Sequence, residues 1–235
     1  IYYPLSRPPG TGKSTLLVSV MCRYLKTHGG RLMVCASTNK AVSLLASRFL
    51  QCITGRTINA VLVGDERKLV QQDNTNDSPL RFMHVTMWIA AMTQDYRSIL
   101  RMEPNTEGSR HLLVKLATLL LYRTEGLKET LLKSQAVSFK VGELTKALDD
   151  DSDFSFDAIL NLVGALLQDF STLPSRDLSQ ELVESADILF CTLSTAGNSI
   201  VSGSREIDDL VVDEAAAATE AEIYIPFCLK PKRLL

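Results

Sequence analysis

An α/β fold with a parallel sheet is predicted for this 235-residue sequence by three observations. Hydrophobic residues make up 46% of the chain and charged residues 22%, which is typical of a globular domain with a sizeable core. Short apolar runs bounded by polar residues, at 31–36, 58–63 and 186–192, have the pattern of buried parallel strands. Between the first two runs, apolar residues from Val42 to Phe49 recur at helical spacing. Strands that alternate with helices in this way form parallel sheets.

Local signals place the elements of the first part in order. Residues 1–6 form an apolar, β-type stretch whose proline restricts it to a strand start or an edge. A turn rich in Pro and Gly precedes a helix that begins at Lys13 and ends at Gly29-Gly30. The strand at 31–36 then leads through the capping residues of segment 37–39 into the next helix.

The middle of the chain, residues 67–176, is predicted to be a mainly helical insertion. Its helical segments are separated by polar linkers, and the predicted helices are 86–102, 109–123, 140–148 and 155–169. The α/β pattern resumes at 177–235 with a short helix, the strand at 186–192, a strand at 210–212 and a helix that begins at the following alanines. We therefore expect a sheet domain of two segments, 1–66 and 177–235, interrupted by this insertion.

Charge and cysteine content narrow the classes of function. The formal net charge of −2 gives no global basic field for nucleic acid, although a local basic groove can lie on a neutral domain. The five cysteines form no Cys-x-x-Cys pair, so we expect buried free thiols in a reducing compartment. The three histidines are scattered and do not suggest a metal cluster. We expect an intracellular location, nuclear or cytoplasmic, and no membrane span.

The strongest chemical signal is a P-loop (Walker A) pattern, Pro8-Pro9-Gly10-Thr11-Gly12-Lys13-Ser14-Thr15, between a predicted strand and a predicted helix. Glycines let backbone N–H groups surround phosphate oxygens, and a helix N-terminus adds partial positive charge. Lys13 can reach the β- and γ-phosphates of a nucleoside triphosphate, and the Ser14 hydroxyl can ligate Mg²⁺. The candidate nucleotide-binding residues are therefore Pro9, Gly10, Thr11, Gly12, Lys13, Ser14 and Thr15.

One position departs from the P-loop pattern G-x-x-x-x-G-K-[ST]. Its first glycine would stand at position 7, where this chain has Arg7. If that position requires a positive φ, arginine strains the loop by roughly 1–3 kcal/mol and weakens nucleotide binding. A sequence error near this end of the chain is an equally good explanation.

A second signal (Walker B) is the apolar run that ends in Asp213 and Glu214. An acidic pair after a buried strand suits a Mg²⁺ contact from Asp213 and a water-activating base at Glu214. Acidic pairs also begin helices favourably, so the pattern becomes specific only beside the P-loop. Glu214 and Lys13 are the candidate catalytic residues. The neighbouring Asp208 and Asp209 are interpreted as turn residues.

Three segments, PPGTGKST (8–15), CASTNKAV (35–42) and VVDEAAAATEAE (211–222), resemble motifs I, Ia and II of superfamily 1 helicases. The similarity is to the branch that contains senataxin and the nonsense-mediated-decay helicase. The segment LFCTLSTAG (189–197) also resembles the Ic region of that branch. About half of the chain carries this resemblance. It implies the first RecA-like P-loop NTPase lobe of a helicase, with ATP and Mg²⁺ as cofactors. It also implies single-stranded RNA or DNA as a partner, contacted by Ser37, Thr38, Asn39, Thr192 and Ser194. Helix capping is the alternative role for the first two of these residues.

The resemblance also implies parts that this chain does not carry. It stops before motif III, and a second RecA-like lobe with arginine fingers would be a partner. Such arginines contribute roughly 10³–10⁵ in rate, so we expect this chain to bind nucleotide, hydrolyse it slowly and not unwind a duplex alone. Two alternatives remain. One is a non-catalytic nucleotide- or RNA-binding scaffold. The other is an AAA+ ATPase, although the 200 positions between Lys13 and Asp213 argue against it.

Overall fold

The computed structural model describes residues 12–27, 29–53, 58–70, 78–149 and 155–234. The described residues divide into two compact units. The first, which we name the sheet unit, contains the chain up to Val85 and from Val183 onward; the second, the helical unit, contains Thr86–Leu182. Within the described ranges, no helix is long and apolar enough to cross a membrane.

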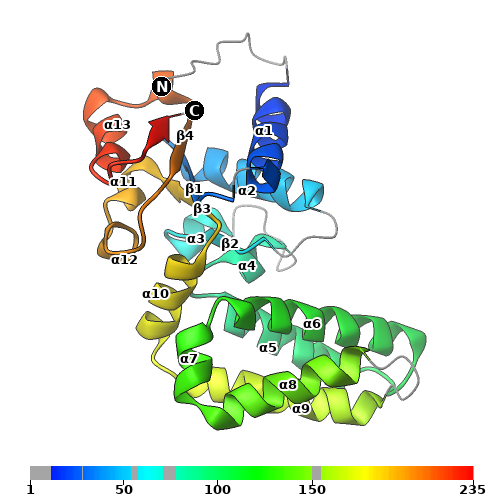
Figure 1. Cartoon of the computed structure of the whole chain (residues 1–235). Helices are drawn as coiled ribbons and strands as arrows, with labels where there is room; N and C mark the ends of the chain where they lie inside the picture. Colours follow the sequence, from blue (N-terminus) through cyan, green and yellow to red (C-terminus); the bar gives the residue numbers. More distant parts are fainter. Residues whose placement is uncertain (1–11, 28, 54–57, 71–77, 150–154, 235) are drawn as a thin grey trace. The chain divides into compact units, whose positions relative to one another are not determined.

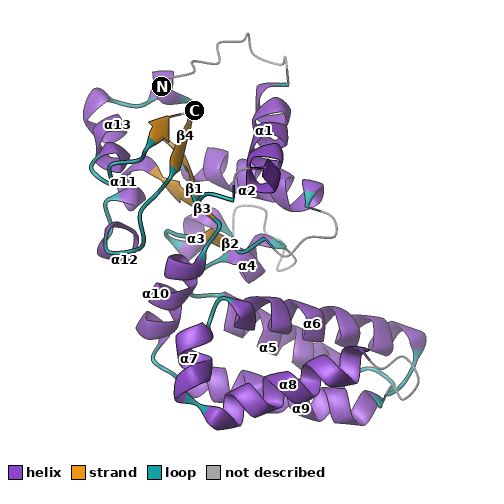
Figure 2. Cartoon of the chain, viewed as in Figure 1, coloured by secondary structure: helices purple, strands orange, loops and turns teal. Residues whose placement is uncertain are grey.

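The sheet unit is organised around a parallel sheet (Figures 1 and 2). Its strands within the described residues are β1 (Leu32–Ala36), β2 (Ala60–Leu62), β3 (Ile188–Thr192), β4 (Asp209–Asp213) and β5 (Arg233–Leu234). Their order is β2-β3-β1-β4-β5, and every neighbouring pair is parallel. All residues of β1 and β3 are buried, because helices lie over such strands, and this is why their sequences are continuous apolar runs. The predicted α/β fold with a parallel sheet is confirmed.

The central strand β1 aligns the ends of its two neighbours. Leu32 of β1 lies opposite Ile188 of β3 and Asp209 of β4. At the other end, Ala36 lies opposite Thr192 and Asp213. Parallel strands in this register bring the residues that follow β1, β3 and β4 to one edge of the sheet.

Helices lie on both sides of this sheet in Figure 1, with α1 and α2 on one side and α11, α12 and α13 on the other. Phe49 of α2 packs its ring 5.4 Å from that of Phe190 in β3. The helices of this unit are α1 (Lys13–Thr27), α2 (Asn39–Cys52), α3 (Glu66–Leu69), α4 (Leu80–Met83), α11 (Leu193–Ala196), α12 (Ser199–Ser202) and α13 (Glu220–Phe227). Helix α10 (Ser175–Ser185) runs across the boundary between the two units.

The helical unit has a core of its own. Its helices are α5 (Trp88–Leu100), α6 (Glu107–Glu125), α7 (Lys128–Lys133), α8 (Gln135–Asp149) and α9 (Phe156–Thr172). Trp88 of α5 packs edge-on against Phe170 of α9, with ring centroids 5.5 Å apart. Side chains such as Leu120 and Val163 are fully buried among these helices. A mainly helical region between the two sheet segments is therefore confirmed, while the boundaries 66/67 and 176/177 stay predictions.

Several element predictions were wrong in detail. The alanines after Asp213 form only a 3₁₀ turn (η2, Ala215–Ala217), and α13 begins later. The reason is that Thr219 and Glu222 form a capping box, a stronger helix start than alanine. Helix α7 was not predicted, and α8 begins at Gln135, five residues early. The predicted strand at 1–6 lies outside the described residues.

Candidate functional site

The described part of the P-loop pattern is the start of α1. Gly12 has φ +76°, a left-handed conformation that glycine adopts without strain, and Lys13 is the first residue of the helix. The Gly12 carbonyl accepts a hydrogen bond from Leu16 N at 3.0 Å, which closes the first turn. Ser14 and Thr15 follow within that turn, where free backbone N–H groups favour an anion. The candidate residues Pro9, Gly10 and Thr11, and also Arg7, lie outside the described residues.

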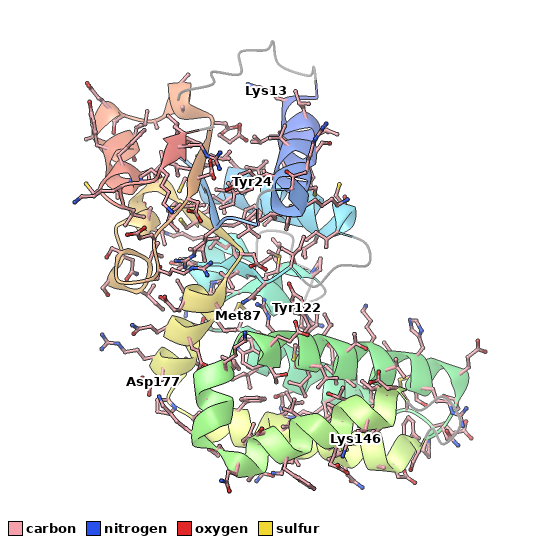
Figure 3. All side chains as sticks on the ribbon, in the orientation of Figure 1. Lys13, Tyr24, Met87, Tyr122, Lys146 and Asp177 are labelled. Carbon is pink, nitrogen blue, oxygen red and sulfur yellow. The ribbon has the colours of Figure 1, made fainter. Side chains whose placement is uncertain are left out.

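The direction of α1 places its start at the carboxyl edge of the sheet. Tyr24, near the end of α1, donates a hydrogen bond to Asp209, the first residue of β4. Lys13 lies eleven residues earlier, about 16 Å along a helix, while β4 covers about 13 Å before it ends at Asp213. Figure 3 shows Lys13 and Tyr24 toward opposite ends of α1, and in Figure 1 this helix begins toward the edge where β4 ends. The basic and acidic candidates therefore share one edge.

The acidic pair lies where β4 leaves the sheet. Asp213 is the last residue of β4, and its side chain is half-buried. Its Oδ1 accepts a hydrogen bond from Glu214 N at 3.0 Å. Glu214 has φ 53° and ψ 34°, so it turns the chain through a left-handed conformation that costs a side-chain-bearing residue about 1–2 kcal/mol. An exposed carboxylate on a strained backbone is a candidate functional group rather than a packing residue.

The candidate nucleic-acid residues after β1 have different environments. The Thr38 hydroxyl accepts a hydrogen bond from Ala41 N at 3.2 Å and caps α2, so its capping role is shown. Asn39, the first residue of α2, is half-buried. The Ser37 Oγ is buried and has no hydrogen-bond partner among the described residues. A buried hydroxyl without a partner is rare, and it marks this position as one where a ligand atom would be favourable.

A cluster of hydroxyl groups follows β3. Thr192 caps α11 by accepting a hydrogen bond from Thr195 N at 3.2 Å. Its Oγ1 also lies 2.7 Å from Thr195 Oγ1 and 3.1 Å from Ser194 Oγ. Thr192 is buried, whereas Ser194 is exposed. Sequence reasoning missed Thr195, although a threonine three residues after a capping threonine is a signal for such a pair.

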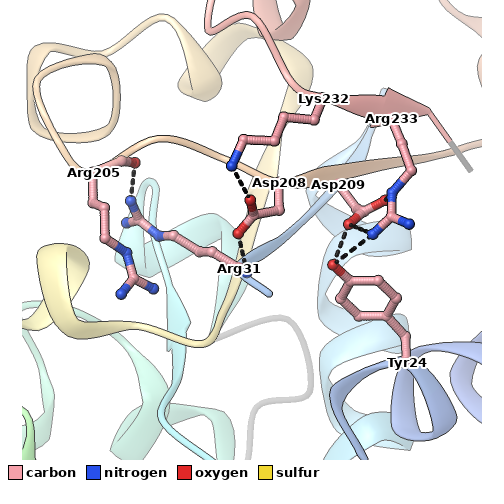
Figure 4. A network of polar contacts seen from close by, with 7 residues as sticks. All are labelled: Tyr24, Arg31, Arg205, Asp208, Asp209, Lys232 and Arg233. Carbon is pink, nitrogen blue, oxygen red and sulfur yellow. Dashed lines mark hydrogen bonds and ion pairs between the residues drawn. The ribbon is translucent and has the colours of Figure 1, made fainter. Parts of the chain in front are cut away.

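Figure 4 shows a second polar cluster, at the amino ends of the strands, which the sequence did not predict. Asp209 was interpreted as a turn residue, but it begins β4 and is fully buried. It accepts hydrogen bonds from Arg233 Nε at 2.8 Å and from the Tyr24 hydroxyl. Burial and this second hydrogen bond raise the pKa of Tyr24 to about 12.

Asp208 and Arg31 extend this amino-end cluster. Asp208 accepts hydrogen bonds from Arg31 N at 2.8 Å and Lys232 Nζ at 2.6 Å, and these two bonds lower the pKa of its carboxyl. The buried Arg31 guanidinium donates to the carbonyls of Val183 and Arg205. The cluster joins α1, β4, β5 and the ends of neighbouring loops, so its role is structural.

These features define a class of protein. The sheet is parallel, and α1 begins directly after Gly12 with Lys13 and Ser14. The acidic pair Asp213-Glu214 lies where the strand β4 ends, at the same edge of the sheet. This is the arrangement of a RecA-like P-loop NTPase fold.

Comparison with known proteins places the chain more closely. A protein-family model described as AAA domain (AAA_11) matches residues 4–235, and the chain belongs to this family. The chain is also 25% identical over 228 residues to a Regulator of nonsense transcripts 1 homolog of Drosophila melanogaster. A homolog of the same description from Arabidopsis thaliana is 25% identical over 228 residues. Both alignments cover 97% of this chain but only 14% and 13% of these relatives. The comparisons confirm the resemblance to the nonsense-mediated-decay branch of superfamily 1 helicases and support an ATP-binding, helicase-type lobe.

Proposed function

We propose that this chain is the ATP-binding lobe of an ATP-dependent RNA or DNA helicase, in which nucleotide hydrolysis drives movement along a single strand. The observation that carries the proposal is the shared edge, where α1 begins at Lys13 and β4 ends at Asp213. A second RecA-like lobe would be the partner that completes the site. The relatives' much greater length is compatible with such additional parts.

The residues at this edge fit a Mg²⁺-bound nucleotide. Mg²⁺ prefers oxygen ligands and keeps several waters, so one carboxylate and one hydroxyl beside the substrate phosphates suffice. Asp213 and Ser14 are the residues that would hold it. When bound, Mg²⁺ neutralises negative charge on the phosphates.

The remaining residues have distinct roles in this proposal. Lys13 contributes a positive charge to the β- and γ-phosphates, and the free N–H groups of the first α1 turn add donors. Glu214 is exposed and accepts a proton from the attacking water at its carboxylate. The left-handed turn fixes the backbone of Glu214 directly after Asp213, so both acids act at one edge.

The same edge supports contacts with a nucleic-acid backbone. Ala36 and Thr192 are register partners, so Ser37, Asn39 and Ser194 follow neighbouring strands on that edge. Hydroxyl and amide groups suit phosphate contacts, which position a strand without reading its sequence. Thr38 and Thr192 contribute through the helices that they cap.

The experiment that tests this proposal is calorimetric titration of Mg-ATP into the chain, with Lys13→Ala beside it. Lys115→Ala, on the exposed face of α6, is the matched control. We expect the wild-type chain to bind, the Lys13 variant to lose more than about tenfold in affinity, and the control to be unchanged. A wild-type chain that is folded but does not bind would refute the proposal.

Hydrolysis separates the enzyme from the scaffold alternative. Glu214→Gln should keep nucleotide affinity and reduce the hydrolysis rate about 10²–10⁴-fold, since only a general base is removed. Because the chain alone is expected to hydrolyse nucleotide slowly, the deciding assay uses a longer protein that includes a second lobe. Nucleotide binding with no hydrolysis by that protein, even with single-stranded RNA present, would favour a non-catalytic nucleotide-binding scaffold.

A further inference from the structure

Charge is segregated along this chain. The first 64 residues contain eight Lys and Arg residues and no Asp or Glu. All 27 acidic residues follow Gly64, together with the other 17 Lys and Arg residues. The net charge of −2 therefore combines a +8 segment with a −10 segment. A segment of one sign creates a local field wherever its side chains reach solvent.

Besides Lys13 at the candidate nucleotide site, four basic side chains among the described residues of this segment reach solvent, and we name them the basic strip. They are Arg23 and Lys26 on α1, and Lys40 and Arg48 on α2. None of the four has an ion-pair partner within the described ranges of the chain. Arg31 of the same segment differs, because it is buried and donates to backbone carbonyls. The positive charges of the strip therefore do not stabilise the fold through ion pairs within the described residues.

Helix geometry brings Lys26 and Arg48 together across the seam between α1 and α2. Lys40, Arg48 and Cys52 lie on one row of α2, because residues four apart share a helix face. Burial raises the pKa of the Cys22 thiol of α1, Cys52 raises it further and Lys26 lowers it, so these three groups are close. Arg48 thus lies one turn before this contact and Lys26 one turn after it.

Acidic neighbours lie on the other flank of α2. Asp65 caps α3 and Glu66 begins it, and α3 contacts α2 through a hydrogen bond of 2.7 Å from Ser43 Oγ to the Leu69 carbonyl. Ser43 and Cys52 are about 180° apart around the helix. Arg48, about 140° from Ser43, therefore faces away from these acidic residues, whereas Lys40 lies about 60° from Ser43.

We propose that the basic strip binds the phosphate backbone of single-stranded nucleic acid, as an extension of the contacts at the carboxyl edge. Lys40 directly follows Asn39, so the strip continues from the candidate edge residues. Eight residues separate Lys40 from Arg48, about 12 Å, which matches roughly three phosphate spacings of a stacked strand. The aromatic residues of α1 and α2, Tyr24 and Phe49, are buried and offer no surface on which a base would stack, so the contact is independent of sequence. This inference rests on the proposed function for the identity of its ligand.

The test is fluorescence anisotropy of the chain with a labelled oligouridylate of about 15 nucleotides, over a range of salt concentrations. The variant is Arg23→Gln/Lys26→Gln/Arg48→Gln. The matched control is Arg97→Gln/Arg101→Gln/Lys115→Gln, the same change of charge at exposed positions of the helical unit. We expect the strip variant to lose about 10- to 100-fold in affinity at low salt. The slope of log K against log salt should become shallower by about 0.7 for each lost phosphate contact. The control should change less than about twofold, and both variants should keep wild-type circular dichroism and Mg-ATP binding.

Three results would overturn the inference. If strip and control variants bind alike while Asn39→Ala/Ser194→Ala weakens binding, the strip is not a contact and the proposed edge site stands. If the wild-type chain binds no oligouridylate but binds Mg-ATP, both nucleic-acid proposals fail and the nucleotide site stands. If polyglutamate of equal charge competes as well as RNA, the strip is a site for acidic polypeptides instead.

Discussion

The two ends of the parallel strands differ in how their polar groups are used. At the amino end, Asp208 and Asp209 accept hydrogen bonds from four other residues, as Figure 4 shows. At the carboxyl end of the same strands, Ser37 Oγ has no partner among the described residues and Glu214 holds a left-handed backbone. Both ends are rich in polar residues, so composition does not distinguish them.

This difference separates structural from functional polar residues. Buried polar groups stabilise a fold only when their hydrogen bonds are made, and the amino end satisfies that condition. Unused hydrogen-bonding capacity and local strain reduce stability, and they persist where a ligand uses them. The amino end thus holds the sheet together, while the carboxyl end supplies the candidate site.

The largest expected effect is at the amino end. Asp209→Ala should lower the free energy of unfolding by about 1–3 kcal/mol, because it leaves the buried Tyr24 hydroxyl without its acceptor. Urea denaturation measures this change. Asp213→Ala, at the other end of the same strand, is the control, and it should lower the free energy of unfolding much less. Equal losses for both variants would erase the proposed difference between the ends.

Alkaline pH should also act at the amino end. The pKa of Tyr24 is raised to about 12 in the folded chain, against about 10 in an unfolded one. The contribution of the protonated Tyr24 hydroxyl to the free energy of unfolding is complete below pH 10. It decreases as the pH rises toward 12, by up to about 1.4 kcal/mol per pH unit. Urea denaturation at several pH values, with Tyr24→Phe subtracted as the non-titrating reference, measures it. A wild-type chain and variant with parallel pH profiles would contradict this assignment.

Strain at the carboxyl end predicts a gain of stability. Glu214→Gly should raise the free energy of unfolding by about 1 kcal/mol, since glycine accepts a positive φ without steric cost. The same substitution should abolish hydrolysis, because it removes the carboxylate. Glu214→Gln keeps the strained backbone and should leave stability unchanged. If Glu214→Gly is destabilising, the left-handed turn stores no strain.

The smallest expected effect concerns the unpaired hydroxyl. Ser37→Ala should change the free energy of unfolding by less than about 0.5 kcal/mol, or raise it, because the Oγ makes no hydrogen bond that would be lost. Affinity for oligouridylate should nevertheless decrease about threefold or more. Thr38→Ala is the comparison, and it should cost about 1 kcal/mol through its cap. A large loss of stability in Ser37→Ala would show that the hydroxyl has a structural partner.

Much of the sheet could be predicted because the signal is local. The strands β1 and β3 are runs of consecutive buried apolar residues, and α1 begins directly after a glycine turn. The 3₁₀ turn at Ala215–Ala217 was missed because alanine favours helices, whereas the capping residue Thr219 decides where α13 begins.

The amino-end cluster could not be predicted, because its contacts are distant in sequence. Asp209 follows another aspartate, which is typical of a turn, and its partner Tyr24 is 185 positions away. The site itself was visible as motifs, but the use of each hydroxyl was not. Thr38 caps α2 while the neighbouring Ser37 Oγ has no partner among the described residues. Which of the two hydroxyls reaches the helix N-terminus depends on the local backbone conformation, which the sequence does not show.

The most direct test compares two aspartates of one strand. Mg²⁺-dependent ADP binding should be measured for Asp213→Asn and Asp209→Asn by calorimetry, below the unfolding transition of each variant. We predict that Asp213→Asn loses the Mg²⁺-dependent part of the affinity and keeps its stability, while Asp209→Asn loses stability and keeps the Mg²⁺ dependence. Full Mg²⁺ dependence in Asp213→Asn, or its loss only in Asp209→Asn, would contradict a nucleotide site at the carboxyl edge.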